Sequence, residues 1–200
     1  SKSALFLDLD NDGDQDLVVA TVASVLVLEN DGKANFSLRS GFPGMSNPHS
    51  LSAADYDSDG DLDLFVCNYG ADSVTGGVSG SMAGPPLPFN DAENGGRNAL
   101  LRNDGSLQFS DVTSAAGIAT GSDRWSFAAS WEDYDNDGDQ DLYVANDFGR
   151  NNLFRNDAGR FTDVAAAAGV EDISSGMSVA WSDANRDGRM DVYVSNMFSS

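Results

Sequence analysis

The sequence predicts an all-β fold made of β-propeller-type, four-stranded blades, and three observations support this. An acidic nine-residue loop occurs four times, a short run of β-branched and aromatic residues follows each copy, and a strand–turn–strand element recurs between copies. The loops begin at Asp8, Asp55, Asp133 and Asp183, so they are 47, 78 and 50 residues apart. A period of roughly 40 to 50 residues with four strands per unit is typical of propeller blades.

Each unit is expected to run strand, acidic loop, strand, strand, turn, strand. The runs after the loops are LVVAT, LFVCN, LYVAN and VYVSN, whose composition favours strands. The third and fourth strands come from 25–38, 99–118 and 152–170, where an NDG or NDA turn separates two apolar runs. The last two segments continue into a connector of small residues that ends at Gly117 or Gly169.

These units predict one domain over residues 1–200 with about three and a half blades. The blades cover about 1–45, 46–118, 119–170 and, in part, 171–200, and residues 69–97 form a Pro- and Gly-containing insertion in the second blade. We expect this insertion to be a functional or flexible loop. An open stack exposes strand edges, so the chain is expected to be a segment of a longer polypeptide or a protomer that completes its sheets with a neighbour, as in a filament.

The acidic loops predict calcium sites, up to four in number. Each places oxygen side chains at positions 1, 3, 5 and 9 and glycine at position 6, and a backbone carbonyl at position 7 completes such a shell. An EF-hand is excluded because position 12 is valine instead of glutamate. The predicted metal residues are Asp8, Asp10, Asp12, Asp14 and Asp16; Asp55, Asp57, Asp59, Asp61 and Asp63; Asp133, Asp135, Asp137, Asp139 and Asp141; and Asp183, Asn185, Asp187, Arg189 and Asp191.

The alternative for any one loop is a solvated turn, since Asp, Asn and Gly are common turn residues. Four copies favour metal, because closely spaced carboxylates repel one another unless a cation neutralises them. The loops hold 18 of the 32 acidic residues, and the net charge of −21 argues against nucleic acid or an anionic membrane surface as a partner. No apolar run approaches the roughly 18 residues of a membrane span.

Other residues favour structural roles. Cys67 is the only cysteine and is expected to be buried, and the aromatic residues beside the strands are expected to pack between blades, with sugar stacking as the alternative. His49 is placed in a loop without a catalytic partner. Arg102, Arg155 and Glu29 occupy equivalent positions before a turn and are expected to brace neighbouring charges. No catalytic residue is predicted.

The unit at 131–170, WEDYDNDGDQDLYVANDFGRNNLFRNDAGRFTDVAAAAGV, resembles the FG-GAP or VCBS repeat found in proteins similar to cartilage acidic protein and in the integrin α-subunit head. The resemblance implies a calcium-binding β-propeller that is extracellular or at the cell surface, acts in adhesion, and binds a protein or glycan. It also implies that the loop residues listed above bind the metal. The alternatives are a self-associating subunit of an extracellular filament or surface layer, or part of a calcium-dependent polysaccharide lyase. The lyase needs a cluster of basic residues, which the 11 scattered Lys and Arg do not form.

Overall fold

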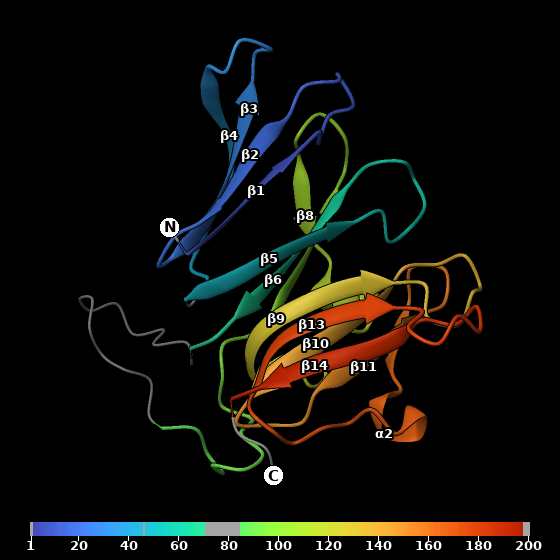
Figure 1. The fold of residues 1–200 in the computed structure, drawn as a ribbon. Helices are drawn as coiled ribbons and strands as arrows, with labels where there is room; N and C mark the ends of the chain where they lie inside the picture. Colours follow the sequence, from blue (N-terminus) through green and yellow to red (C-terminus); the bar gives the residue numbers. More distant parts are fainter. Residues whose placement is uncertain (1, 46, 71–84, 198–200) are drawn as a thin grey trace.

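The computed structural model describes residues 2–45, 47–70 and 85–197, and it is an all-β structure of stacked antiparallel sheets (Figure 1). Three sheets have four strands and the last has two, as the sequence predicts. Sheet 1 contains β1 (Ser3–Leu7), β2 (Asp16–Ala20), β3 (Ser24–Asn30) and β4 (Phe36–Pro43); sheet 2 contains β5 (Pro48–Ala54), β6 (Asp63–Asn68), β7 (Ala99–Asn103) and β8 (Phe109–Asp111); sheet 3 contains β9 (Trp125–Glu132), β10 (Asp141–Asp147), β11 (Asn152–Asn156) and β12 (Phe161–Asp163); and sheet 4 contains β13 (Gly176–Ser182) and β14 (Asp191–Asn196).

Each sheet is a meander in which strands pair in chain order, and the acidic loop joins its first two strands. The register is the same in all four sheets, because the residue before the loop pairs with the ninth residue of the loop. These pairs are Leu7 with Asp16, Ala54 with Asp63, Glu132 with Asp141 and Ser182 with Asp191. The loops therefore all emerge at the same end of their hairpins.

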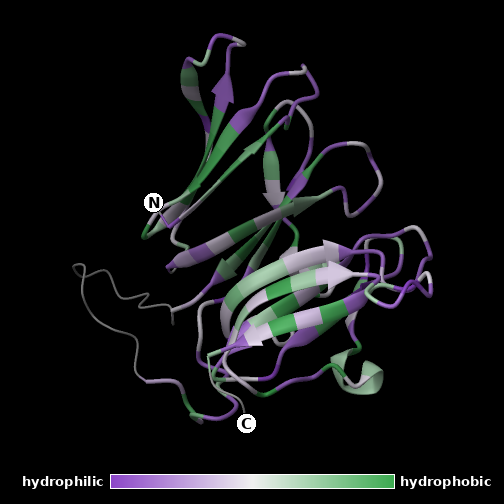
Figure 2. Ribbon diagram, in the orientation of Figure 1, coloured by the Kyte–Doolittle hydropathy of each residue, from purple (hydrophilic) through white to green (hydrophobic). Residues whose placement is uncertain are grey.

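The sheets pack face to face in sequence order, and the first strand of each sheet lies beside the first strand of the next (Figure 1). Side chains alternate along β6: Leu64 and Val66 enter the core between sheets 1 and 2, while Phe65 and Cys67 enter the core between sheets 2 and 3. Burial on both faces explains why the second strands of sheets 2 and 3 are apolar runs. Hydrophobic residues accordingly follow the strands and hydrophilic residues the loops in Figure 2.

The two ends of the stack carry outward-facing apolar side chains. On sheet 1, Phe6 and Leu38 are 57% and 62% exposed, and on sheet 4 Tyr193 is 70% exposed. Tyr193 has the same place in its strand as Phe65 and Tyr143, which are buried between sheets. Both outer faces thus have the composition of an inter-sheet face.

The connectors are one-turn helices, α1 (Thr113–Ala116) and α2 (Ala165–Ala168), which the sequence analysis describes only as small-residue segments. Gly117 and Gly169 end them in the left-handed conformation, with φ of 96° and 73°. His49 is in strand β5 and not in a loop, so that expectation is wrong. The register of β5 shifts between Pro48 and Ser50, and such a bulge tolerates residues with little strand preference.

The insertion at 69–97 is described only in part, since residues 71–84 lie outside the described residues. Its second half packs on sheet 3. The Ala92 amide donates to the Phe148 carbonyl at 2.8 Å, and the Asp91 carboxylate pairs with Arg124 at 2.6 Å and with Arg150 at 3.0 Å. None of the helices in the described part of the chain has the length and apolarity to cross a membrane.

Candidate metal sites

All four acidic loops share one backbone conformation. The fourth position, occupied by Asn11, Ser58, Asn136 and Arg186, is left-handed with φ between 59° and 63°. The glycine at position 6 has φ of 93°, 95°, 99° and 83° in chain order. Residues with a side chain rarely adopt φ between 80° and 100°, so the loop needs glycine at position 6 in order to close.

The carboxylate at position 1 holds the loop from inside. Asp55 accepts hydrogen bonds from the amides of Asp59 and Gly60, both at 3.0 Å, and Asp133 and Asp183 accept the equivalent bonds at 2.9 to 3.0 Å. Asp8 accepts from Gly13 at 3.1 Å. The carboxylate at position 5 accepts the amide of position 7 in every loop at 2.9 to 3.0 Å. The spacing of the motif therefore sets the geometry before any ligand is considered.

Four carboxylate oxygens of the first two loops are buried and have no hydrogen-bond partner among the described residues. These are Oδ1 of Asp8, Asp10, Asp14 and Asp57. Three groups of carboxylates have ligand atoms within 4.8 Å of one another: Asp8, Asp10 and Asp12; Asp55, Asp57 and Asp63; and Asp133, Asp135 and Asp141. Buried, unpaired carboxylates are unfavourable unless a cation accompanies them, and a donor set made only of oxygen atoms fits a hard cation. These three clusters could hold a metal ion.

The raised pKa values of the loop carboxyl groups reflect the same two effects, burial and repulsion between neighbouring acids. Burial, and after it the neighbouring acids Asp16 and Asp12, raise the pKa of Asp10. Burial and the adjacent loop acids likewise raise the pKa of Asp57 and Asp135. Burial raises the pKa of Asp63 to about 7 and that of Asp141 to about 6, although backbone hydrogen bonds oppose it. The clusters thus carry negative charge that the protein alone does not balance.

The ninth position does more than the sequence analysis proposes. The two oxygens of Asp63 accept the amides of Tyr56 at 3.2 Å and Asn103 at 2.8 Å. Asp16 and Asp141 accept the equivalent pairs of amides at 2.7 to 3.2 Å, and Asp191 accepts the amide of Ala184 at 3.1 Å. In sheets 1 to 3 this residue therefore ties the loop to the third strand of its own sheet. A carboxylate oxygen has a further lone pair, so its predicted role as a metal ligand stays compatible with these bonds.

At position 7 the side chains of two loops point to other partners. Asp61 accepts a hydrogen bond from the Asn11 side chain of the first loop at 2.7 Å, and Asp139 accepts the Ala158 amide at 2.7 Å. This arrangement leaves the backbone carbonyl as the natural ligand atom at this position, and it explains why Arg189 is tolerated in the fourth loop. The metal role of Asp14, Asp61, Asp139 and Arg189, predicted through the backbone carbonyl at position 7, stays a prediction.

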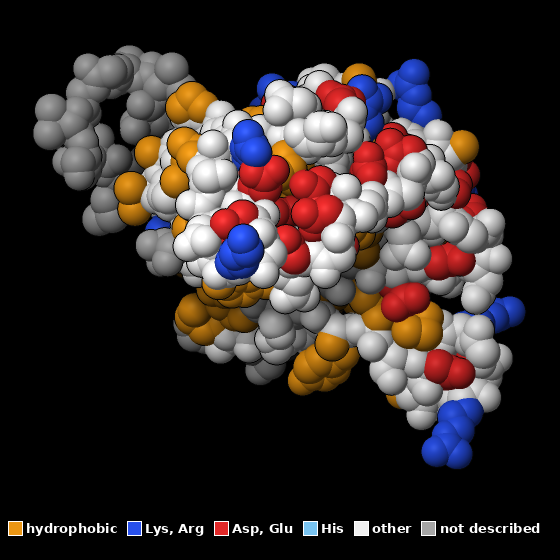
Figure 3. All heavy atoms as spheres, turned by 90° about the horizontal axis from the view of Figure 1, so that it is seen from above, with side chains coloured by type: hydrophobic (Ala, Val, Ile, Leu, Met, Phe, Trp, Pro, Cys, Tyr) orange, Lys and Arg blue, Asp and Glu red, His pale blue; other side chains and the backbone are white. Residues whose placement is uncertain are grey.

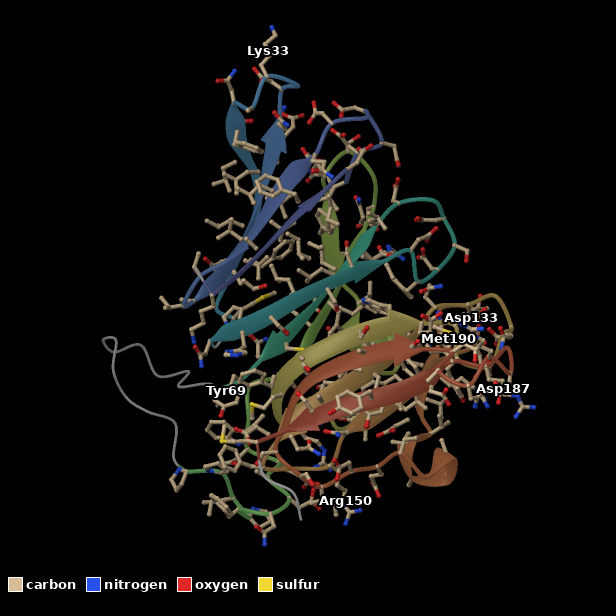
Figure 4. The ribbon with its side chains drawn as sticks, in the orientation of Figure 1. Lys33, Tyr69, Asp133, Arg150, Asp187 and Met190 are labelled. Atoms are coloured by element: carbon tan, nitrogen blue, oxygen red, sulfur yellow. The ribbon has the colours of Figure 1, made fainter. Side chains whose placement is uncertain are left out.

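The fourth loop keeps the backbone but changes the donors. The Asn185 side chain accepts the Asp187 amide at 2.8 Å and donates to the Asp187 carboxylate at 3.1 Å. In the described parts of the chain, the fourth loop does not bring three acidic side chains within 4.8 Å. Because the neutral Asn185 amide replaces a carboxylate at position 3, the repulsion between side chains is weaker in this loop. The fourth loop therefore depends less on a bound cation than the other three loops do. Asp133 and Asp187 in Figure 4 mark the third and fourth loops, which lie at the same end of the sheets, with Tyr69 at the other end.

Two asparagines, one for each loop, link the first and second loops to the following sheets. The sequence does not predict these links. Asn103 of β7 donates to the Leu9 carbonyl in the first loop at 2.8 Å, and Asn156 of β11 donates to the Tyr56 carbonyl in the second loop at 2.7 Å. Both asparagines are fully buried. The sequence signal for these links is the asparagine that begins each NDG or NDA turn, but the turn itself already accounts for an asparagine there.

Salt bridges around the loops confirm another prediction. Arg102 pairs with Asp104 at 2.6 Å, Arg155 pairs with Asp157 at 2.9 Å, and Glu29 pairs with Arg39. Acidic side chains are numerous on the face in Figure 3, where a few Lys and Arg side chains lie among them. The burial of Cys67 is also confirmed.

Comparisons with known proteins agree with this arrangement. The family model of the FG-GAP-like repeat matches residues 8–66, 90–144 and 133–194, which together include all four loops. Among solved structures, a lectin from Agrocybe aegerita, described for its recognition of non-reducing terminal N-acetylglucosamine, superposes with a TM-score of 0.53 at 20% identity. The alignment covers 97% of this chain and 47% of the lectin, so this chain spans about half the lectin's length. No curated protein matches the sequence. The repeat model covers most of the chain, and the protein therefore belongs to the FG-GAP-like repeat family.

Proposed function

We propose that this chain is an extracellular or cell-surface repeat module in which calcium ions hold the acidic loops and a surface of the blades binds a glycan or a protein. The observation that carries the metal assignment is the convergence of three carboxylates in each of three loops, together with buried carboxylate oxygens without partners in the first two of these clusters. Calcium is favoured over magnesium because it accepts 6 to 8 oxygens in flexible geometry, whereas magnesium keeps several waters.

The residues that would hold each ion are the carboxylates at positions 1, 3, 5 and 9, with the carbonyl at position 7. A bound cation supplies the positive charge that these acids lack. Because Asn103 and Asn156 fix the first two loops to the following sheets, a better-ordered loop also stabilises the contact between sheets. Structural sites of this kind match the millimolar calcium found outside cells, which supports the proposed location.

Support for a binding role comes from the family and from the structural likeness. At 20% identity the lectin shows only the fold, and its own recognition of a terminal N-acetylglucosamine is the reason to propose a glycan as a ligand here. The test is to apply the calcium-loaded protein to an array of printed glycans and extracellular matrix proteins. Saturable binding to a defined glycan or protein supports the proposal, and an array without signal in the presence of calcium refutes the binding role.

A second candidate function, self-association, is favoured by the outer faces of the stack. Phe6 packs against Phe36 on the outside of sheet 1 with ring centroids 6.1 Å apart, and Tyr193 projects from sheet 4. Exposed apolar faces of this kind mark interaction surfaces. Sedimentation velocity on the wild type and on Leu38→Asp and Tyr193→Asp tests this candidate. Concentration-dependent association that either variant weakens supports it, and a monomer at all concentrations refutes it.

A further inference from the structure

A pocket of about 230 Å³ lies between sheets 1 and 2, away from the acidic loops. Its apolar wall comes from the end of β4 and the following turn, and its polar wall comes from the ends of β6, β7 and β8. The lining includes Phe42, Gly44, Met45, Asn68, Arg97 and Asp111. Pockets for drug-sized ligands measure roughly 300 to 1,000 Å³, so this one suits a smaller group.

The pocket exists because the first blade lacks the helical connector. Between sheets 2 and 3, the segment of α1 places Ala116 and Ile118 in the core, where they are 4% and 0% exposed. In the first blade, the chain passes from β4 through Gly44 and Met45 directly to β5. A Cβ atom at Gly44 would lie more than 4 Å from every described atom outside the adjacent residues of the chain. The space that α1 fills at the next interface therefore stays open at this one.

The polar wall contains groups that have no partner in the described part of the chain. Asn68 is 2% exposed, its Nδ2 donates to the Arg97 carbonyl at 2.5 Å, and its buried Oδ1 accepts no hydrogen bond from any described residue. A buried amide oxygen of this kind requires a donor. Asp111 uses Oδ1 to accept bonds from Thr113 at 2.6 and 3.0 Å, and within the described ranges its Oδ2 accepts none.

Arg97 differs from its counterpart in the third blade. Arg150 occupies the same place before β11 and pairs with Asp91 at 3.0 Å and Glu171 at 2.7 Å. Arg97 is exposed and donates to Ser114 of α1 at 2.7 Å, and none of the described acids forms a salt bridge with it. Its remaining N–H groups are therefore free to bind a ligand. Arg97 and Asp111 together bring one positive and one negative charge to the pocket, so the wall has no net charge that would select an anion or a cation.

We propose that this pocket binds one neutral sugar residue at the end of a glycan, with Arg97, Asp111 and the Asn68 amide oxygen as polar contacts. Hydroxyl groups both donate and accept, which matches one guanidinium donor and two oxygen acceptors. The apolar face of a pyranose ring suits the wall of Phe42 and Met45, and the edge-on packing of Phe42 on Phe109 fixes the orientation of its ring. This inference rests on the proposed glycan-binding function.

The test uses the calcium-loaded protein on the glycan array, followed by saturation-transfer NMR titration with the neutral monosaccharide that ends the best-bound glycan. Arg97→Ala and Asp111→Asn each remove a charged contact from an exposed side chain. A charge-assisted hydrogen bond contributes enough that each loss is expected to weaken binding roughly tenfold or more. Arg160→Ala is the control, since Arg160 is also exposed and also contacts α1, through the Ala115 carbonyl at 2.6 Å.

The expected result is binding of a neutral terminal sugar that both pocket variants weaken and the control preserves. If glycans bind and both pocket variants bind them as the wild type does, the pocket assignment is overturned while the glycan-binding function stands. Binding only to acidic sugars also overturns the proposal, because it contradicts the neutral site. An array that shows binding to proteins and no glycans overturns this inference and the glycan part of the proposed function together.

Discussion

Replacing Asn156 with alanine should separate the stability contributed by contacts between sheets from that within one sheet. Asn156 is fully buried, donates to the Tyr56 carbonyl of the second loop at 2.7 Å and to the Gln140 carbonyl of its own sheet at 3.1 Å, and accepts the Gly159 amide at 2.8 Å. At about 1 kcal/mol for each hydrogen bond, the substitution should lower the free energy of unfolding by about 3 kcal/mol.

The repeat supplies a matched control. Asn30 holds the same place in sheet 1, where it donates to Gln15 at 3.1 Å and accepts from Ala34 at 3.0 Å, but the described residues contain no preceding sheet for it to contact. Asn30→Ala should therefore cost about 1 to 2 kcal/mol, less than Asn156→Ala. The assay is urea denaturation in saturating calcium, monitored by tryptophan fluorescence. An Asn156→Ala cost equal to or smaller than the Asn30→Ala cost would refute the role assigned to the link between sheets.

The other predictions concern pH, the loop glycine and the outer faces. Burial raises the folded-state pKa of Asp63 to about 7 and that of Asp141 to about 6, above the ordinary value of about 4 that these groups have in the unfolded chain. The stability of the metal-free protein should therefore fall as pH rises from about 4 to about 7 and then level off. Calcium requires ionised carboxylates, so the gain in melting temperature on adding calcium to chelator-treated protein should be larger at pH 8 than at pH 5; an equal gain contradicts this reasoning. Gly138→Ala places a side chain at φ of 99°, so we expect a loss of roughly 1 to 3 kcal/mol and weaker calcium binding. Gly169→Ala also places a side chain at a left-handed residue, with φ of 73°, but at the end of α2, so it should leave the calcium affinity measured by titration calorimetry unchanged. Tyr143→Ser should destabilise the protein by roughly 3 kcal/mol or more because Tyr143 is buried, whereas Tyr193→Ser should change melting little; equal effects would disprove the assignment of inner and outer faces.

Much of the fold could be predicted from the sequence because it depends on local signals. The runs after each acidic loop are β-branched and aromatic, and in sheets 2 and 3 they are buried on both faces, which explains their continuous apolar character. The position of the loops in hairpins followed from glycine at position 6, since no other residue accepts φ near 90° at low cost. Strand order and the partial fourth sheet followed from the repeat period.

The remaining features depend on contacts between distant residues. Asn103 lies 94 positions from its partner Leu9, and Asn156 lies 100 positions from Tyr56, so an NDG turn alone does not reveal either link. His49 joins β5 through a bulge and packs with ring centroids 4.2 Å from Phe127, a tertiary contact that overrides its weak strand preference. The pocket beside Arg97 was also hidden, because it results from a helix that the first blade lacks.

The central claim is that calcium in the acidic loops holds this repeat structure together. Differential scanning calorimetry of protein stripped of metal, then refilled with calcium or with magnesium, tests it most directly. Our account predicts a large rise in melting temperature with calcium, a smaller rise with magnesium, and a further increase as calcium concentration rises above the dissociation constant. An identical melting temperature in the stripped and calcium-filled protein would contradict it.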